Sequence, residues 1–138
     1  MILVVFGTRP EWLKIKPLVE EMSKSNIKFD LVRVKQHDDL LTITDPKLPT
    51  LYQCIPISKI EGTDRLSNLG SEILLKMSRL LGEYKNKYSN EYINVLVQGD
   101  TATAYYTALA AFQSQCFVVH LEAGLRTYDM TNPYPEEF

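Results

Sequence analysis

Two kinds of side chain in this sequence are suited to act together on a small, negatively charged molecule. Carboxylates can take up and release protons during a reaction. Guanidinium groups bind phosphate oxygens, and so do the amino-terminal ends of helices. The carboxylates are Asp100, Glu122, Glu136 and Glu137, and the cations are Arg9, Lys14 and Arg126. Together these residue types predict acid/base chemistry on an anionic ligand.

Several of these residues also have a purely structural interpretation. Asp100 comes just before a predicted helix, so it could simply cap that helix. Glu122 could pair with Arg126 across a turn. Glu11 lies three residues after Thr8, which is the spacing of a capping box. These interpretations explain the residues singly, but they do not explain why so many of them follow the ends of predicted strands.

Other kinds of site are not indicated. The sequence has no nucleophile elbow, no Walker A lysine and no G-x-G-x-x-G loop after its first strand, so a dinucleotide cofactor is not expected. His37 and His120 have no third ligand in view, so no metal site is predicted. Cys54 and Cys116 are 62 positions apart in apolar surroundings. This spacing fits neither a metal site nor a disulfide framework, and both are expected to be core thiols.

Length and composition are typical of one globular domain. The chain has 138 residues, of which 45% are hydrophobic and 23% are charged. Its net charge of -2 gives no electrostatic reason to expect binding to nucleic acid or to an anionic membrane. The first residues form an apolar run that is too short for a signal peptide or a membrane span. A cytoplasmic location is therefore expected.

Short apolar runs alternate with segments of helical period. Strands are expected at residues 2–6, 29–34, 93–97 and 117–121, with a further short strand near 51–55. Helices are expected after Thr8 and at residues 66–88 and 101–112. Such alternation favours parallel pairing with right-handed crossovers. The predicted fold is one α/β domain over residues 1–138, with a doubly wound, mainly parallel, Rossmann-like sheet.

In such sheets, ligands bind beyond the carboxyl ends of the strands. The polar residues that follow the predicted strands should therefore lie along one rim. They are Thr8, Arg9, Glu11, Gln36, His37, Asp38, Gln98, Gly99, Asp100, His120, Glu122 and Arg126.

Four stretches, in order along the chain, closely resemble the motifs of a known enzyme family. They are FGTRPEWLKIKPL (residues 6–18), VQGDTATA (97–104), HLEAGLRT (120–127) and PYPEE (133–137). The family is that of the non-hydrolysing UDP-N-acetylglucosamine 2-epimerases. The resemblance implies one half of a glycosyltransferase-B architecture, in which two Rossmann-like domains face each other across a cleft. The chain is similar to the amino-terminal domain, and the carboxyl-terminal domain is expected to be absent from it.

The resemblance implies interconversion of UDP-N-acetylglucosamine and UDP-N-acetylmannosamine, by elimination of UDP and its readdition on the other face, without a cofactor. The acid/base carboxylates would be Asp100, Glu122 and Glu136. The substrate-binding residues would be Arg9, Lys14, His37 and Arg126, with Arg9 and Lys14 near the phosphates. Which carboxylate removes the proton from C2 is left open.

The sequence departs from the family pattern in places. The usual GDTTT is GDTAT here, with Ala102, and Lys35 precedes Gln36 and His37 in place of a small residue. Because a second domain would complete the site, the chain is expected to need that domain as a partner for activity. Two alternative functions stay open: a truncated, non-catalytic domain that binds a nucleotide sugar or a partner protein, and another glycosyltransferase-B enzyme. Pairing as a homodimer is also left open.

Overall fold

The computed structural model describes residues 1–35, 52–57, 64–133 and 136–137. Five strands among these residues form one parallel sheet in the order β3-β2-β1-β4-β5. The strands are β1 (Ile2–Phe6), β2 (Phe29–Lys35), β3 (Tyr52–Pro56), β4 (Asn94–Gln98) and β5 (Phe117–Leu121). The helices are α1 (Arg9–Lys24), α2 (Arg65–Lys87) and α3 (Ala102–Gln113). The predicted α/β fold with a doubly wound parallel sheet is confirmed.

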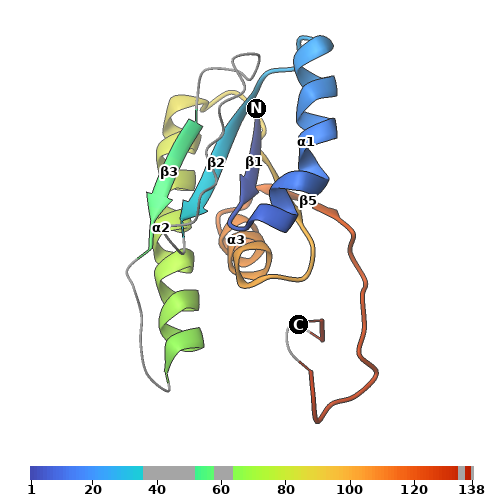
Figure 1. Ribbon diagram of the computed structural model, residues 1–138. Coiled ribbons are helices and arrows are strands. Elements are labelled where there is room, and N and C mark those ends of the chain that lie inside the picture. Colours follow the sequence, from blue (N-terminus) through green and yellow to red (C-terminus); the bar gives the residue numbers. More distant parts are fainter. Residues whose placement is uncertain (36–51, 58–63, 134–135, 138) are drawn as a thin grey trace.

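Helices cover both faces of the sheet, with α1 on one face and α2 and α3 on the other (Figure 1). Successive residues of a strand point to opposite faces, and β1 shows this clearly. Val4 and Phe6 belong to the buried cluster that includes Ile15 of α1. Leu3 and Val5 belong to the cluster formed with α2 and α3. The continuous apolar run of β1 is therefore explained by burial on both sides.

The predicted elements all occur, and each predicted end matches the structure or differs from it by one residue. β5 has the predicted bounds, and the short strand expected near 51–55 is β3 (Tyr52–Pro56). The expected capping box at the start of α1 is present. The predicted residues Gln36, His37 and Asp38 lie outside the described residues.

After the neighbouring strands β1 and β4, the chain crosses to opposite faces of the sheet. β1 and β4 are neighbours in the sheet, yet β1 leads into α1 on one face and β4 leads into α3 on the other. This divergence is the topological switch point of a doubly wound sheet, where a crevice opens beyond the carboxyl ends of the strands. The rim predicted from the sequence is therefore centred on the loops after β1 and β4.

β5 is the outermost strand on its side of the described sheet, and it is poorly covered. Phe117, Val118 and Val119 are 56%, 39% and 43% exposed. Because consecutive residues point to opposite faces, both faces of β5 expose apolar surface. Cys116, which precedes this strand, is half-buried and packs against the α2 and α3 cluster, and burial raises the pKa of its thiol.

Two further kinds of structure were sought among the described residues. None of the helices there combines the length and apolar character needed to cross a membrane. Nor does this part of the chain contain a group of three or more His, Cys, Asp or Glu side chains placed to hold a metal ion. The side chain of Cys54 is not among those described.

Candidate active site

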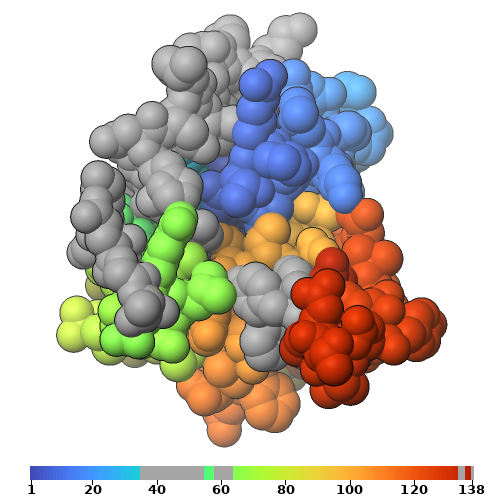
Figure 2. Space-filling model, turned by 60° about the horizontal axis from the view of Figure 1, so that its bottom comes forward, coloured from blue at the N-terminus to red at the C-terminus, as the bar shows by residue number. Residues whose placement is uncertain are grey.

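A hollow of about 270 Å³ lies at the carboxyl ends of β4 and β5. Its lining includes four of the predicted site residues, which are Asp100, Glu122, Arg126 and Glu136. Figure 2 views the molecule from this edge and shows the carboxyl-terminal segment (red) on the same side as the loop and helix that follow β4 (yellow to orange). The three carboxylates predicted to be catalytic thus share one hollow, although they are distant in the sequence.

Glu122 is held by two side chains from other elements. Its carboxylate accepts hydrogen bonds from Lys14 Nζ of α1 and, at 2.5 Å, from Gln98 Nε2 at the end of β4. Gln98 is only 3% exposed, so its amide is a fixed donor. The hydrogen bond from Lys14, its positive charge and the bond from Gln98 hold the pKa of Glu122 below its ordinary value. The site therefore presents Glu122 as an ionised carboxylate.

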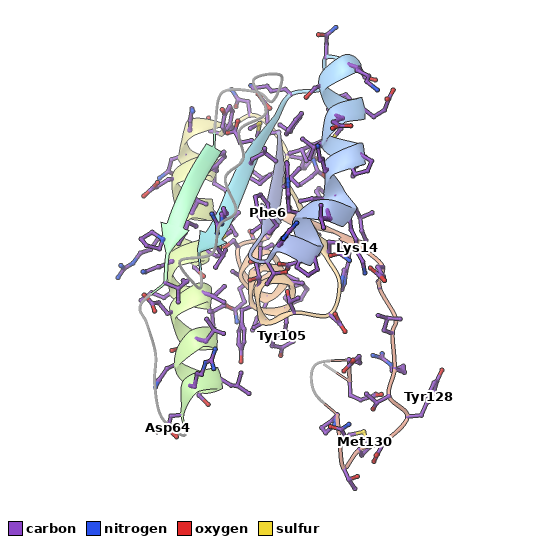
Figure 3. All side chains as sticks on the ribbon, in the orientation of Figure 1. Phe6, Lys14, Asp64, Tyr105, Tyr128 and Met130 are labelled. Carbon is purple, nitrogen blue, oxygen red and sulfur yellow. The ribbon has the colours of Figure 1, made fainter. Side chains whose placement is uncertain are left out.

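Lys14 is thus placed at the site by α1, as Figure 3 shows. The structural alternative in which Glu122 pairs with Arg126 is wrong, because Arg126 binds elsewhere and Lys14 is the ion-pair partner. Lys14 is thus paired with Glu122, although its side chain is 54% exposed. Glu122 adopts a left-handed backbone conformation, with φ of 58°, directly after β5.

Asp100 does not cap α3, so the structural interpretation of this residue is also wrong. The cap is Thr101, whose hydroxyl accepts a hydrogen bond from the amide of Ala104 at 3.1 Å. Gly99, with φ of 78°, makes the turn that precedes it. Within the described part of the chain, no hydrogen bond or ion pair engages the Asp100 carboxylate, which lines the hollow. Asp100 is therefore available to a ligand.

The loop that carries Asp100 is fixed by β5. The amide of Gly99 donates to the carbonyl of Leu121 at 3.0 Å. The Nε2 atom of His120 lies 2.7 Å from the carbonyl oxygen of Gly99. His120 thus holds the glycine turn in place and also lines the hollow.

Glu137 closes the carboxyl-terminal segment into a loop. Its Oε1 accepts hydrogen bonds from the amides of Thr127 at 2.7 Å and Tyr128 at 3.0 Å. The hydrogen bond from the Tyr128 amide is the main cause that lowers the pKa of Glu137. The bonds from Thr127 and the positive charge of nearby Arg126 lower it further. Arg126 also donates to the backbone carbonyl of Glu136 at 2.8 Å. Glu137 and Arg126 therefore fix the backbone at Glu136, which lines the hollow.

Three predicted substrate-binding residues are not in this lining. Lys14 only contacts a lining residue, Glu122. Arg9 is the first residue of α1, is exposed, and lies on the neighbouring part of the rim. His37 lies outside the described residues. Tyr105 of α3 lines the hollow but was not predicted. It could have been predicted from its position in the first turn of α3, the helix that follows the turn at Gly99.

Comparison with known proteins gives a consistent result. A family model described as UDP-N-acetylglucosamine 2-epimerase matches residues 20–138. The UDP-N-acetylglucosamine 2-epimerase of Campylobacter jejuni is 40% identical over 99% of this chain, which covers 34% of that relative. The chain therefore spans about a third of the length of the curated relatives it matches.

Solved structures agree with this assignment. One crystal structure of a UDP-N-acetylglucosamine 2-epimerase superposes with a TM-score of 0.79 and 36% identity, over 99% of this chain and 36% of that one. The Neisseria meningitidis enzyme, solved bound to UDP-GlcNAc, gives a TM-score of 0.74 and 32% identity over 99% of this chain and 36% of its own. Since the family model covers most of the sequence and the folds agree, this chain belongs to the UDP-N-acetylglucosamine 2-epimerase family.

Proposed function

We propose that this chain is the amino-terminal part of an enzyme that interconverts UDP-N-acetylglucosamine and UDP-N-acetylmannosamine. The observation that carries the proposal is the convergence of Asp100, Glu122 and Glu136 on one hollow, with Lys14 bound to Glu122. The Neisseria meningitidis relative, solved with UDP-GlcNAc bound, supports this choice of substrate. A cytoplasmic location and a homodimer stay predictions.

The proposed reaction has two stages that balance without a redox change. UDP departs with the electron pair of the bond between C1 and its oxygen, while a carboxylate takes the proton from C2, which leaves 2-acetamidoglucal. UDP then adds back to C1, and a proton is delivered to C2 from the opposite face. Oxidation states are restored over the cycle, so the reaction calls for no redox cofactor.

The charged residues suit these two stages. Removing a proton from an unactivated sugar carbon is difficult, so charge must be drawn toward the departing phosphates, where cations stabilise it. Lys14 and Arg9 lie on the same helix and would serve this purpose. A positioned carboxylate contributes roughly 10² to 10⁴ in rate to a proton transfer. Inversion at C2 asks for proton donors and acceptors on more than one side of the ring, which several carboxylates supply.

Glu122 and Arg126 have more specific roles in the proposal. The bonds from Lys14 and Gln98 keep Glu122 ionised, so it is suited to accept a proton. Arg126 donates to the Glu136 carbonyl and pairs with Glu137, and its N–H groups not used in these contacts would bind the substrate. The order in which Asp100, Glu122 and Glu136 move protons is not assigned.

A complementation assay tests the proposal. The 138-residue chain would be fused to the part of the Campylobacter jejuni relative that it does not match, and epimer exchange measured together with deuterium incorporation at C2 in heavy water. We expect both signals. Asp100→Asn and Glu122→Gln should each lower turnover by orders of magnitude with the fold kept. Glu83→Gln, on the exposed side of α2, is the matched control.

Two outcomes would contradict the proposal. A folded fusion protein that shows neither exchange nor deuterium incorporation would refute the activity. If the 138-residue chain nevertheless gives NMR shifts on titration with UDP-N-acetylglucosamine, the non-catalytic binding domain becomes the better description. If spectra stay unchanged at millimolar ligand as well, neither function holds.

A further inference from the structure

Glu11 is a buried carboxylate that connects two loops of the rim. It lies in the first turn of α1 and is only 2% exposed. Its Oε2 accepts hydrogen bonds from the amides of Gly7 at 2.9 Å and Thr8 at 2.5 Å. Its Oε1 accepts a hydrogen bond from the hydroxyl of Thr101 at 2.6 Å. Both oxygens are therefore engaged, one by each loop.

A capping box explains only the contact with the amide of Thr8. In that motif the third helical residue reaches back to the amide of the N-cap residue, which here is Thr8. The partner of Oε1 is 90 residues away in the sequence and belongs to another helix. Thr101 caps α3 and accepts from the amide of Ala104 with the same oxygen that donates to Glu11. One carboxylate thus joins the beginnings of two helices.

The two helices begin on opposite sides of the switch point. α1 follows β1, α3 follows β4, and these strands are paired at the centre of the sheet. The crevice that binds ligands in such folds opens where these two loops diverge. The hydrogen bond between Glu11 and Thr101 joins these two loops where they diverge. Because β1 and β4 pair directly, no other strand separates the two loops that this hydrogen bond joins.

Two proposed site residues adjoin the ends of this connection. Arg9 follows Thr8 directly, and Asp100 directly precedes Thr101. Burying a carboxylate is costly unless its oxygens are hydrogen-bonded, and here three donors and the amino-terminal ends of two helices compensate for it. The contact is therefore expected to persist rather than to exchange with water.

We propose that Glu11 is a positioning residue that sets the distance between Arg9 and Asp100 across the crevice. The inference rests on the proposed function, because it concerns the positions of two residues in that reaction. Arg9 is the cation proposed to bind the phosphates, and Asp100 is a carboxylate proposed to act on the sugar. Glu11 does not contact the substrate in this scheme. It acts on the site through Thr8 and Thr101.

Substitutions at Thr101 separate this connection from helix capping. Ser and Asp are both good N-cap residues, so Thr101→Ser and Thr101→Asp each keep an acceptor for the amide of Ala104. Ser also keeps the hydroxyl donor for Glu11. Asp has no donor and sets a second carboxylate against Glu11. Thr101→Ser is thus the matched control for Thr101→Asp.

The first measurement is kinetic and uses the fusion protein described above. A misplacement of about 1 Å can cost about 10²-fold in rate, so Thr101→Asp should lower kcat by about that factor with a smaller effect on KM. Thr101→Ser should behave like the parent protein. Glu11→Gln, whose amide can accept from the loop and donate to Thr101, should recover most of the activity that Glu11→Ala loses. A folded Thr101→Asp protein with unchanged kcat and KM would overturn the inference.

The second measurement does not depend on activity. Amide hydrogen exchange in the 138-residue chain should accelerate at Gly7 and Thr8 in Thr101→Asp but not in Thr101→Ser, although neither substitution touches those amides. Unchanged exchange in Thr101→Asp would refute the connection. If the parent fusion has no activity but exchange responds as stated, the proposed function fails while the connection between the loops stands.

Discussion

Lys14 and Glu122 form an ion pair between the helix that follows the first strand and the residue that follows the last one. They are 108 residues apart in the sequence. Their contact spans the switch point and keeps a proposed phosphate-binding cation against a proposed acid/base carboxylate. Exposed ion pairs usually add little stability. The main effect of this pair is therefore expected to be on the pKa of Glu122 and not on the stability of the fold.

Lys14→Met should raise the pKa of Glu122, because the group that lowers it most is removed. NMR titration of the Glu122 carboxyl carbon in the 138-residue chain measures this directly. In the fusion protein, the acidic limb of the pH profile should move to higher pH. Lys16→Met is the matched control, since Lys16 is on the same helix but pairs with Glu20. Equal titration of Glu122 in both variants would contradict the assignment.

The same shift fixes the sign of a small pH effect on stability. The folded pKa of Glu122 lies below its ordinary value of 4.5, so the pair stabilises the fold above that pH. The contribution is lost as the pH falls through the folded pKa. Thermal unfolding at a series of pH values should show this loss in the parent protein and a smaller one in Lys14→Met.

Glu137 should control the order of the loop beside Glu136. Glu137→Ala removes the acceptor for the amides of Thr127 and Tyr128, so both should exchange faster with solvent. Glu137→Gln keeps an acceptor but loses the charge that faces Arg126, and should be intermediate. Amide exchange followed by NMR is the measurement. If Glu137→Ala leaves both amides as protected as before, the carboxylate does not hold this loop.

Two glycines of α2 should respond oppositely to alanine. A Cβ at Gly70 would lie 2.1 Å from Cζ of Tyr106 on α3, so Gly70→Ala should destabilise the fold by about 1–3 kcal/mol. Gly82 has open space around it, and Gly82→Ala should stabilise the helix by about 0.5–1 kcal/mol. Urea unfolding of both variants decides this. A Gly70→Ala variant that is at least as stable as the parent would show that the contact between α2 and α3 is looser than described.

The poorly covered β5 should make the 138-residue chain self-associate. An outer strand with apolar side chains on both faces is a site for pairing with another chain. Val119→Lys, which places a charge on this strand, should lower the association measured by sedimentation velocity. Leu75→Lys is the control, because Leu75 is 51% exposed on α2, away from the sheet edge. Association that Val119→Lys leaves unchanged would exclude β5 as the contact.

Local signals predicted the elements well because their causes are local. The capping box of Thr8 and Glu11 places the start of α1, and the apolar run of β1 reflects its two covered faces. The order of strands with helices between them predicts the parallel sheet. Because the carboxyl ends of parallel strands share one edge, the sequence also predicted that Asp100 and Glu122 would line the same hollow.

The partners of individual side chains could not be predicted in this way. Sequence proximity suggested Arg126 for Glu122, but the fold brings Lys14 to it from α1. Asp100 and Thr101 are both good N-cap residues, and the turn made by Gly99 decides in favour of Thr101. Such choices depend on tertiary geometry. A capping-box glutamate likewise gives no sign that its second oxygen has a distant partner.

The hydrogen bond between Glu11 and Thr101 has a consequence for how the family varies. A buried carboxylate at position 11 needs a hydroxyl donor across the crevice, and a hydroxyl at position 101 needs that acceptor. Replacing either residue alone leaves a polar atom unsatisfied, so the two positions should change together in evolution. Relatives without a hydroxyl at the position of Thr101 are expected to lack the glutamate as well, and a set of aligned family sequences can test this covariation.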